Sequence, residues 1–176
     1  MAAVADGNSS AFDALVALHL DAIHGYLYRL TGSRHDAEDL AQETFLRLWK
    51  KAGSYEPGRA GVSTWLHSIA HNLSIDAFRK KREVLEPEVR EIEDRRADPA
   101  QQIDSSQQQA LLEAAIAELP ERQRAAILLC QVRGFSNVQA AGIMDLKVRA
   151  LESLLARARR SLRESLSARG ALRRSP

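Results

Sequence analysis

The 176-residue sequence has a single cysteine, few aromatic residues and no long hydrophobic run. With Cys130 alone, an intramolecular disulfide is impossible, and its place directly after Ile127, Leu128 and Leu129 predicts a buried core thiol. No stretch approaches the roughly 18 consecutive apolar residues of a membrane-spanning helix. The N-terminus lacks the pattern of a signal peptide. We therefore expect a cytoplasmic protein without stable membrane insertion.

Strand patterns, internal repeats and glycine-rich phosphate-binding loops are also missing. Alanine, leucine, arginine and glutamate are abundant, which favours helices. Apolar residues recur at helical spacing in nearly every segment. The sequence predicts an all-α protein with helices at about 10–30, 33–49, 63–82, 107–119 and 121–133, followed by two further helices.

Three residue types mark where these helices begin. Ser9 or Ser10 can cap the first helix. Ser33 and Asp36 resemble a capping box in which aspartate replaces glutamate. Pro120 fits the first turn of the helix at 121–133, where a missing backbone N–H costs nothing.

Charge is unevenly distributed although the net charge is only +2. Between residues 83 and 106, eight acidic residues accompany three arginines, and Pro87 and Pro99 interrupt the segment. This composition predicts a flexible linker. Between residues 147 and 174, nine basic residues accompany two glutamates, which indicates a polyanionic partner. We expect two small helical domains, 10–83 and 107–170, joined by an acidic linker at 84–106.

Residues 134–160 have the pattern of a helix-turn-helix. A short amphipathic segment precedes a polar turn around Asp145, and the following segment ends in arginines. Aspartate tolerates the left-handed conformation that such a turn needs. A helix-turn-helix places its second helix in the major groove of DNA, so DNA is the expected partner.

Two groups of side chains resemble a metal site or a catalytic site, but the residues around them do not complete either one. His67 and His71 are four residues apart, a spacing that can hold a metal ion. They lack the glutamate of a metalloprotease helix, and no third ligand is near in sequence. A set of carboxylates lies on the second helix without a nucleophile or binding loop nearby, so a partner-binding face is favoured over catalysis: Asp36, Glu38, Asp39 and Glu43. We expect neither a metal, a cofactor nor an enzyme activity.

The basic run at residues 79–82 has two interpretations. Basic side chains suit the C-terminal end of a helix, so the run can be a solvated helix terminus. The same segment carries Trp65, two histidines and Asn72, a combination suited to unstacked bases and phosphates. The second interpretation makes this segment a candidate surface for single-stranded DNA.

Three ordered motifs resemble the bacterial sigma factors of the sigma-70 family. Residues 36–49 read DAEDLAQETFLRLW and resemble the polymerase-binding segment of region 2. Residues 64–72 read TWLHSIAHN and, continued to residue 82, resemble the segment that opens the promoter and reads its −10 element. Residues 118–124 read ELPERQR and, with the helix-turn-helix, resemble region 4, which reads the −35 element. The resemblance covers about 10–83 and 107–166. With regions 2 and 4 only, the chain resembles the extracytoplasmic-function (ECF) group.

The resemblance implies a role for each matched residue. Facing the clamp helices of the polymerase β′ subunit would be Asp36, Asp39, Gln42, Glu43 and Arg47. At the −10 element would be Trp65, His71, Asn72, Arg79 and Lys80, with Asn72 holding a base flipped from the non-template strand. At the −35 element would be Lys147, Arg149, Glu152, Ser153, Arg157, Arg159 and Arg160, the last three serving phosphates or the polymerase β flap.

The family also implies an anti-sigma factor that covers the polymerase-binding surfaces. This chain departs from the family at Asp145, which replaces the usual turn glycine. It departs again at Lys147 and Arg149, which stand where small residues or proline are common and suggest extra phosphate contact. Two alternatives are a stand-alone helix-turn-helix regulator and, more distantly, a histidine-dependent hydrolase. The acidic face of the second helix argues against a stand-alone regulator, which has no use for it.

Overall fold

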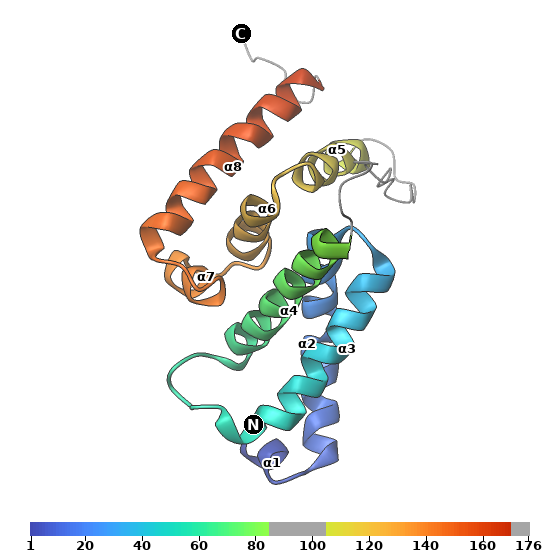
Figure 1. The fold of residues 1–176 in the computed structure, drawn as a ribbon, viewed down its shortest axis with the longest axis vertical. Helices are drawn as coiled ribbons and strands as arrows, with labels where there is room; N and C mark the ends of the chain where they lie inside the picture. Colours follow the sequence, from blue (N-terminus) through green and yellow to red (C-terminus); the bar gives the residue numbers. More distant parts are fainter. Residues whose placement is uncertain (85–104, 170–176) are drawn as a thin grey trace.

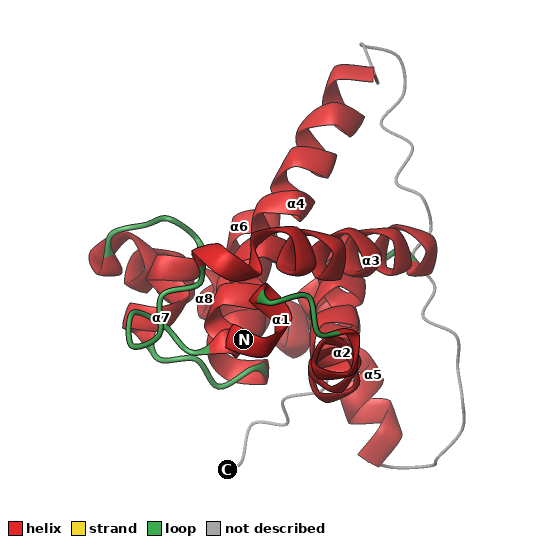
Figure 2. Cartoon of the chain, turned by 90° about the horizontal axis from the view of Figure 1, so that it is seen from below, coloured by secondary structure: helices red, strands yellow, loops and turns green. Residues whose placement is uncertain are grey.

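The computed structural model describes residues 1–84 and 105–169, and every regular element within them is helical (Figures 1 and 2). The all-α prediction is confirmed. The elements are α1 (Ala2–Ala5), α2 (Ser9–Thr31), α3 (Arg34–Lys51), the 3₁₀ turn η1 (Ala52–Ser54), α4 (Val62–Val84), α5 (Ser105–Ala117), α6 (Glu121–Ile127), the π-helical η2 (Leu128–Val132), α7 (Asn137–Ile143) and α8 (Val148–Ala168). The expected linker at 84–106 lies, apart from its two ends, outside the described residues.

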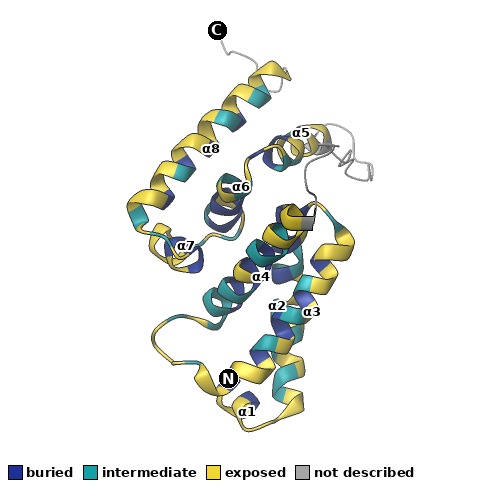
Figure 3. Cartoon of the chain, viewed as in Figure 1, coloured by how far each residue is buried: buried dark blue, intermediate teal, exposed yellow. Residues whose placement is uncertain are grey.

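The N-terminal half, α1 to α4, is a bundle in which α2, α3 and α4 pack on one another. Large aliphatic side chains of α2, among them Ile23 and Leu27, are fully buried. Ala37 and Ala41 of α3 and Ala70 of α4 are buried in the same core. These small side chains let the helix axes approach closely, and the buried positions face inward in Figure 3.

Capping residues set the helix starts. Asn8 caps α2 by accepting a hydrogen bond from the Ala11 N–H at 2.9 Å, so the expectation of a serine cap was wrong by one or two residues. Ser33 caps α3 as expected, accepting from the Asp36 N–H at 3.2 Å. In the expected capping box the Asp36 side chain would accept a hydrogen bond from the Ser33 N–H. The Ser33 N–H donates instead to the hydroxyl of Thr31 at 3.2 Å.

The C-terminal half, α5 to α8, packs α5, α6 and α7 against α8. The helix expected at 121–133 changes to π geometry after Ile127, where the Arg133 N–H donates to the Leu128 carbonyl five residues earlier at 2.9 Å. Pro120 stands at the N-cap of α6 rather than within its first turn. Cys130 is half-buried rather than buried, and its Sγ lies 3.9 Å from Asn137 Oδ1.

Helices α7 and α8 form the helix-turn-helix that the sequence predicts. Ser136 and Gln139 make a complete capping box at the start of α7. Asp145, in the turn, has a φ of 49° and is the only non-glycine residue with positive φ in the described part of the chain. The left-handed turn is therefore confirmed.

The two halves pack against each other. Helix α4 contacts α7, and α2 contacts both α6 and η2 (Figure 1). The buried guanidinium of Arg124 donates to the Leu30 carbonyl at 2.8 Å, and the rings of His67 and Phe135 lie 4.8 Å apart. Two segments far apart in the sequence thus share one buried interface, a packing that the sequence alone left open.

Candidate polymerase and nucleic-acid interfaces

The outer face of α3 is acidic and polar around an apolar centre. Asp39 and Gln42 are exposed and Glu43 is half-buried, opposite the buried stripe of the helix. Asp39 pairs with His35 at 3.1 Å and Glu43 with Arg47 at 2.8 Å, both one helical turn apart.

Leu46, which the site prediction leaves out, lies in the middle of this face with 48% of its surface exposed. Trp49 is exposed at the end of the same helix, and its ring meets Phe12 edge-on at 5.0 Å. A single leucine among charged residues is a weak sequence signal, because exposed leucines are common. An exposed aromatic and an exposed aliphatic side chain within a polar rim are typical of a protein-binding surface.

Three of the predicted −10 residues share one face of α4. Trp65, Asn72 and Arg79 are seven residues apart, which is close to two helical turns, so they align along the helix. Asn72 and Arg79 are exposed, and so is Lys80. Arg79 pairs with Asp76 at 3.1 Å, so a carboxylate partly neutralises the basic end of this face.

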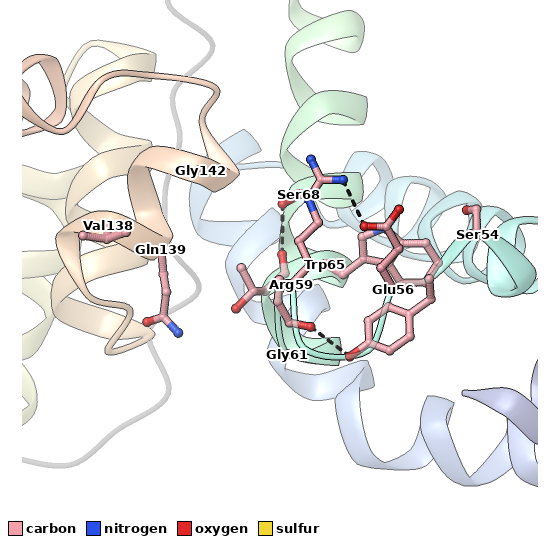
Figure 4. Close-up of a pocket in the computed structure, with 12 residues that line it drawn as sticks. Ser54, Glu56, Arg59, Gly61, Trp65, Ser68, Val138, Gln139 and Gly142 are labelled. Atoms are coloured by element: carbon pink, nitrogen blue, oxygen red, sulfur yellow. Dashed lines mark hydrogen bonds and ion pairs between the residues drawn. The ribbon is translucent and has the colours of Figure 1, made fainter.

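A cavity of about 570 Å³ opens at the Trp65 end of this face (Figure 4). Its floor is the start of α4 and the loop that follows η1. The rings of Tyr55 and Trp65 lie 5.3 Å apart, and Arg59 pairs with Glu56 at 3.3 Å. The Tyr55 hydroxyl donates to the Ala60 carbonyl at 2.8 Å, which fixes the ring. Two aromatic rings beside charged groups suit a planar base.

The loop residues of this cavity were not among the predicted site residues. The available signal was the presence of an aromatic and two charged side chains in a Pro- and Gly-containing loop, because loops often carry binding residues. Helix α7 forms the opposite wall of the cavity through Val138, Gln139 and Gly142. In this arrangement the helix-turn-helix therefore stands over the Trp65 end of α4.

His71, predicted at the −10 surface, is 4% exposed and points into the bundle. Its Nδ1 lies 3.0 Å from the Tyr26 hydroxyl, and burial lowers the pKa of His71 to about 4. A buried, neutral imidazole in this arrangement has no access to a nucleic-acid strand. We therefore leave His71 out of the proposed −10 surface.

Helix α8 presents its basic residues on the side opposite its core. Arg149, Ser153 and Arg160 lie near the centre of the exposed face, whereas Leu151, Leu155, Ala158 and Leu162 are buried. The Ser153 hydroxyl donates to the Arg149 carbonyl at 2.9 Å, so in this structure it is bound within the helix. The four remaining predicted −35 residues are all exposed: Lys147, Glu152, Arg157 and Arg159.

Arg159 lies on the flank of α8. Its charge acts on Cys130, where it opposes the rise in the thiol pKa that burial causes. Arg159 therefore lies nearer to the segment around η2 than to the centre of the basic face.

Two observations concern the described residues as a whole. Residues 1–84 and 105–169 include no group of three His, Cys, Asp or Glu side chains placed to hold a metal ion. None of the helices in these two ranges is both long enough and apolar enough to cross a bilayer.

Comparison with known families matches both halves of the chain. The family described as Sigma-70 region 2 matches residues 15–84, and the family described as Sigma-70, region 4 matches residues 109–162. These matches place α3 and α4 in region 2 and the helix-turn-helix in region 4.

Curated relatives and solved structures agree with the family matches. ECF RNA polymerase sigma factor SigW of Bacillus subtilis is 32% identical over 174 residues, covering 93% of this chain and 92% of the relative. The sigma factor SigE of Mycolicibacterium smegmatis is 36% identical over 160 residues, covering 89% of this chain, but only 62% of that longer relative is spanned.

Two solved structures resemble the whole described arrangement. The sigma factor RpoE of Bartonella quintana, in complex with the anti-sigma factor NepR, superposes with a TM-score of 0.74 at 30% identity, covering 89% of this chain and 97% of that one. CnrH in complex with the cytosolic domain of CnrY superposes with a TM-score of 0.71 at 27% identity, covering 95% and 94%. The chain therefore belongs to the ECF group of the sigma-70 family of RNA polymerase sigma factors.

Proposed function

We propose that this protein binds core RNA polymerase and directs transcription initiation at specific promoters. It acts in the cytoplasm as a specificity factor rather than as an enzyme. The observation that carries the proposal is the coexistence on one chain of three surfaces. These are the acidic and polar face of α3, the Asn72 face of α4, and the basic face of α8.

Core polymerase is the proposed partner of α3. We infer from the resemblance to region 2 that this helix meets the clamp helices of β′, which form a basic docking partner. Asp36, Asp39, Gln42, Glu43 and Arg47 are the residues proposed for that contact. The β flap is the proposed second contact, with region 4.

The test of the overall proposal is reconstitution from purified components. The full chain should co-elute with core polymerase and support run-off transcription from its own promoters. A stand-alone regulator would instead bind duplex DNA without polymerase and fail to co-elute with it. That outcome would replace the proposal with the alternative.

Asn72 is the residue proposed to read one base of the opened −10 element. Its exposed amide offers two donors and an acceptor, enough for a bidentate contact with a base edge. Trp65 precedes it on the same face, and Arg79 and Lys80 follow it as the proposed contacts to the strand backbone.

Replacing Asn72 with alanine should remove about 1–3 kcal/mol of discrimination at one −10 position. The measurement is transcription from linear templates that carry each single −10 base change, with and without Asn72→Ala. We expect the variant to lose its preference at one position only. Equal loss on every template, or no loss on any, contradicts base reading by Asn72.

Arg149 is proposed to contact the −35 element from the first turn of α8, beside Lys147, Glu152 and Ser153. Arg149→Ala should weaken binding to duplex −35 DNA, and the defect should depend on salt concentration. If Arg149 contacts only phosphate, the slope of log K against log salt falls by about one and all sequences are affected alike. Loss of preference at a single base pair would show that Arg149 reads sequence as well.

The closed arrangement of the two halves bears on promoter binding. Positions −10 and −35 are about 25 base pairs apart, which is about 85 Å of duplex at 3.4 Å per base pair. Helix α7 touches α4 here, so the halves must separate before both elements are bound. Because both similar solved structures are complexes with a further protein, and NepR is an anti-sigma factor, we propose that an anti-sigma factor controls this protein.

A further inference from the structure

A histidine with an unsatisfied nitrogen is buried where the two halves meet. His67 of α4 has no exposed surface, and its ring stands edge-on to Phe135 of the C-terminal half and 5.5 Å from Tyr26 of α2. Its Nδ1 lies 2.8 Å from the Ser63 carbonyl, so Nδ1–H is the donor in that bond. The other ring nitrogen, Nε2, is buried without a hydrogen-bond partner. The imidazole is therefore held neutral, with its free nitrogen in an apolar setting.

The charged groups that act on this region are cationic. Arg133, which follows η2, and His19 of α2 act on His67, and Arg133 acts on His19 as well. One turn along α4, the buried His71 faces the Tyr26 hydroxyl of α2 and the charge of Arg122 from α6. A proton added to either ring is opposed both by burial and by a nearby positive charge.

We propose that His67, with His71 as a second contributor, makes the closed interface sensitive to protonation. Neutral imidazoles allow α4 to pack against α7 and the segment around Phe135. Protonation of His67 favours separation of the halves, which hydrates the ring and exposes the Trp65 end of α4. The consequence for promoter binding rests on the proposed function, whereas the conformational change itself does not.

The direction of the effect follows from the buried state. Burial lowers the pKa of His67 to about 4, with Arg133 and His19 adding to the effect, while the Ser63 hydrogen bond opposes it. A ring exposed by opening returns toward the ordinary histidine pKa of about 6.5. Protonation therefore does not weaken the closed state above about pH 6.5. As the pH falls from 6.5 toward 4, the closed state becomes progressively less stable relative to the open state. At pH 5.5 the open-to-closed ratio should be about tenfold higher per exposed histidine than at pH 7.5.

The test is the radius of gyration of the full chain by small-angle X-ray scattering between pH 7.5 and 5.0 at constant ionic strength. Circular dichroism at 222 nm is recorded in parallel. We expect the radius to increase as the pH falls while the helical signal stays constant. His67→Gln, which cannot titrate, should reduce the increase, and His67→Gln with His71→Gln should abolish it.

Two further variants make the result decisive. His67→Phe keeps a ring against Phe135 without a titrating nitrogen and should behave as His67→Gln does, even if one of them folds poorly. His24→Gln is the matched control, because His24 stacks on Tyr28 within α2 and should leave the pH response unchanged. The proposal is overturned by a constant wild-type radius, by unaltered expansion of both His67 variants, or by loss of helix in step with the expansion. If the protein did not bind polymerase, the proposed function would be wrong, but the pH-dependent expansion would still stand.

Discussion

Replacing Asp39 and Glu43 with lysine is expected to abolish promoter-directed transcription and to leave the helical circular dichroism unchanged. Both side chains lie on the outer face of α3, away from its buried stripe. Their partners, His35 and Arg47, are one turn away on the same helix. Such exposed pairs contribute about 0–1 kcal/mol to stability, so the fold should survive their loss. Opposite a basic docking partner, two reversed charges replace attraction with repulsion.

The measurement is run-off transcription together with co-elution of the variant and core polymerase. Asp13→Lys with Asp21→Lys is a matched control, because it makes the same change of charge at exposed positions of α2. The control should retain activity, because the expected defect depends on charge on α3 and not on the net charge of the protein. Normal polymerase binding by the α3 variant would refute the docking assignment.

The second large effect concerns stability. Arg124→Met is expected to lower the free energy of unfolding by about 2–4 kcal/mol. Arg124 is 6% exposed, and its guanidinium donates to the carbonyls of Leu30, Ala117 and Leu119. Methionine fills similar space but has no N–H donor, so these carbonyls lose that partner inside the protein.

The position of these carbonyls explains why one side chain has so much influence. Leu30 lies in the last turn of α2, and Ala117 ends α5, where carbonyls lack partners within the helix. The guanidinium of Arg124 therefore supplies the hydrogen-bond donors that the ends of α2 and α5 lack. The same group links the two halves of the protein.

The measurement is thermal unfolding followed by circular dichroism, in which Arg124→Met should lower Tm by about 5–15 °C. Arg122→Met is the control, because Arg122 is exposed two residues earlier on α6 and should shift stability by less than about 0.5 kcal/mol. An unchanged Tm for Arg124→Met would show that other contacts hold these helix ends.

Sequence alone determined the features that depend on local pattern. Helical periodicity predicted the helices from α2 to α6 to within a few residues but missed the short α1, and Ser33 predicted the start of α3. The left-handed turn at Asp145 followed from the backbone freedom of aspartate. The polar face of α3 followed from its apolar stripe, because a helix that buries one side must expose the other. All of these involve residues within one or two helical turns of each other.

Only the tertiary structure decided the features that join distant residues. Sequence spacing could not show that His71 bonds to Tyr26, 45 residues earlier, and so is buried while its neighbour Asn72 is exposed. The cavity needs α7 to lie against α4, and the Arg124 contact needs α6 to reach the end of α2. Helical periodicity reports that a face is apolar but not which surface will cover it. The packing of two halves, each with its own apolar faces, is therefore settled only when side chains from both meet and exclude water.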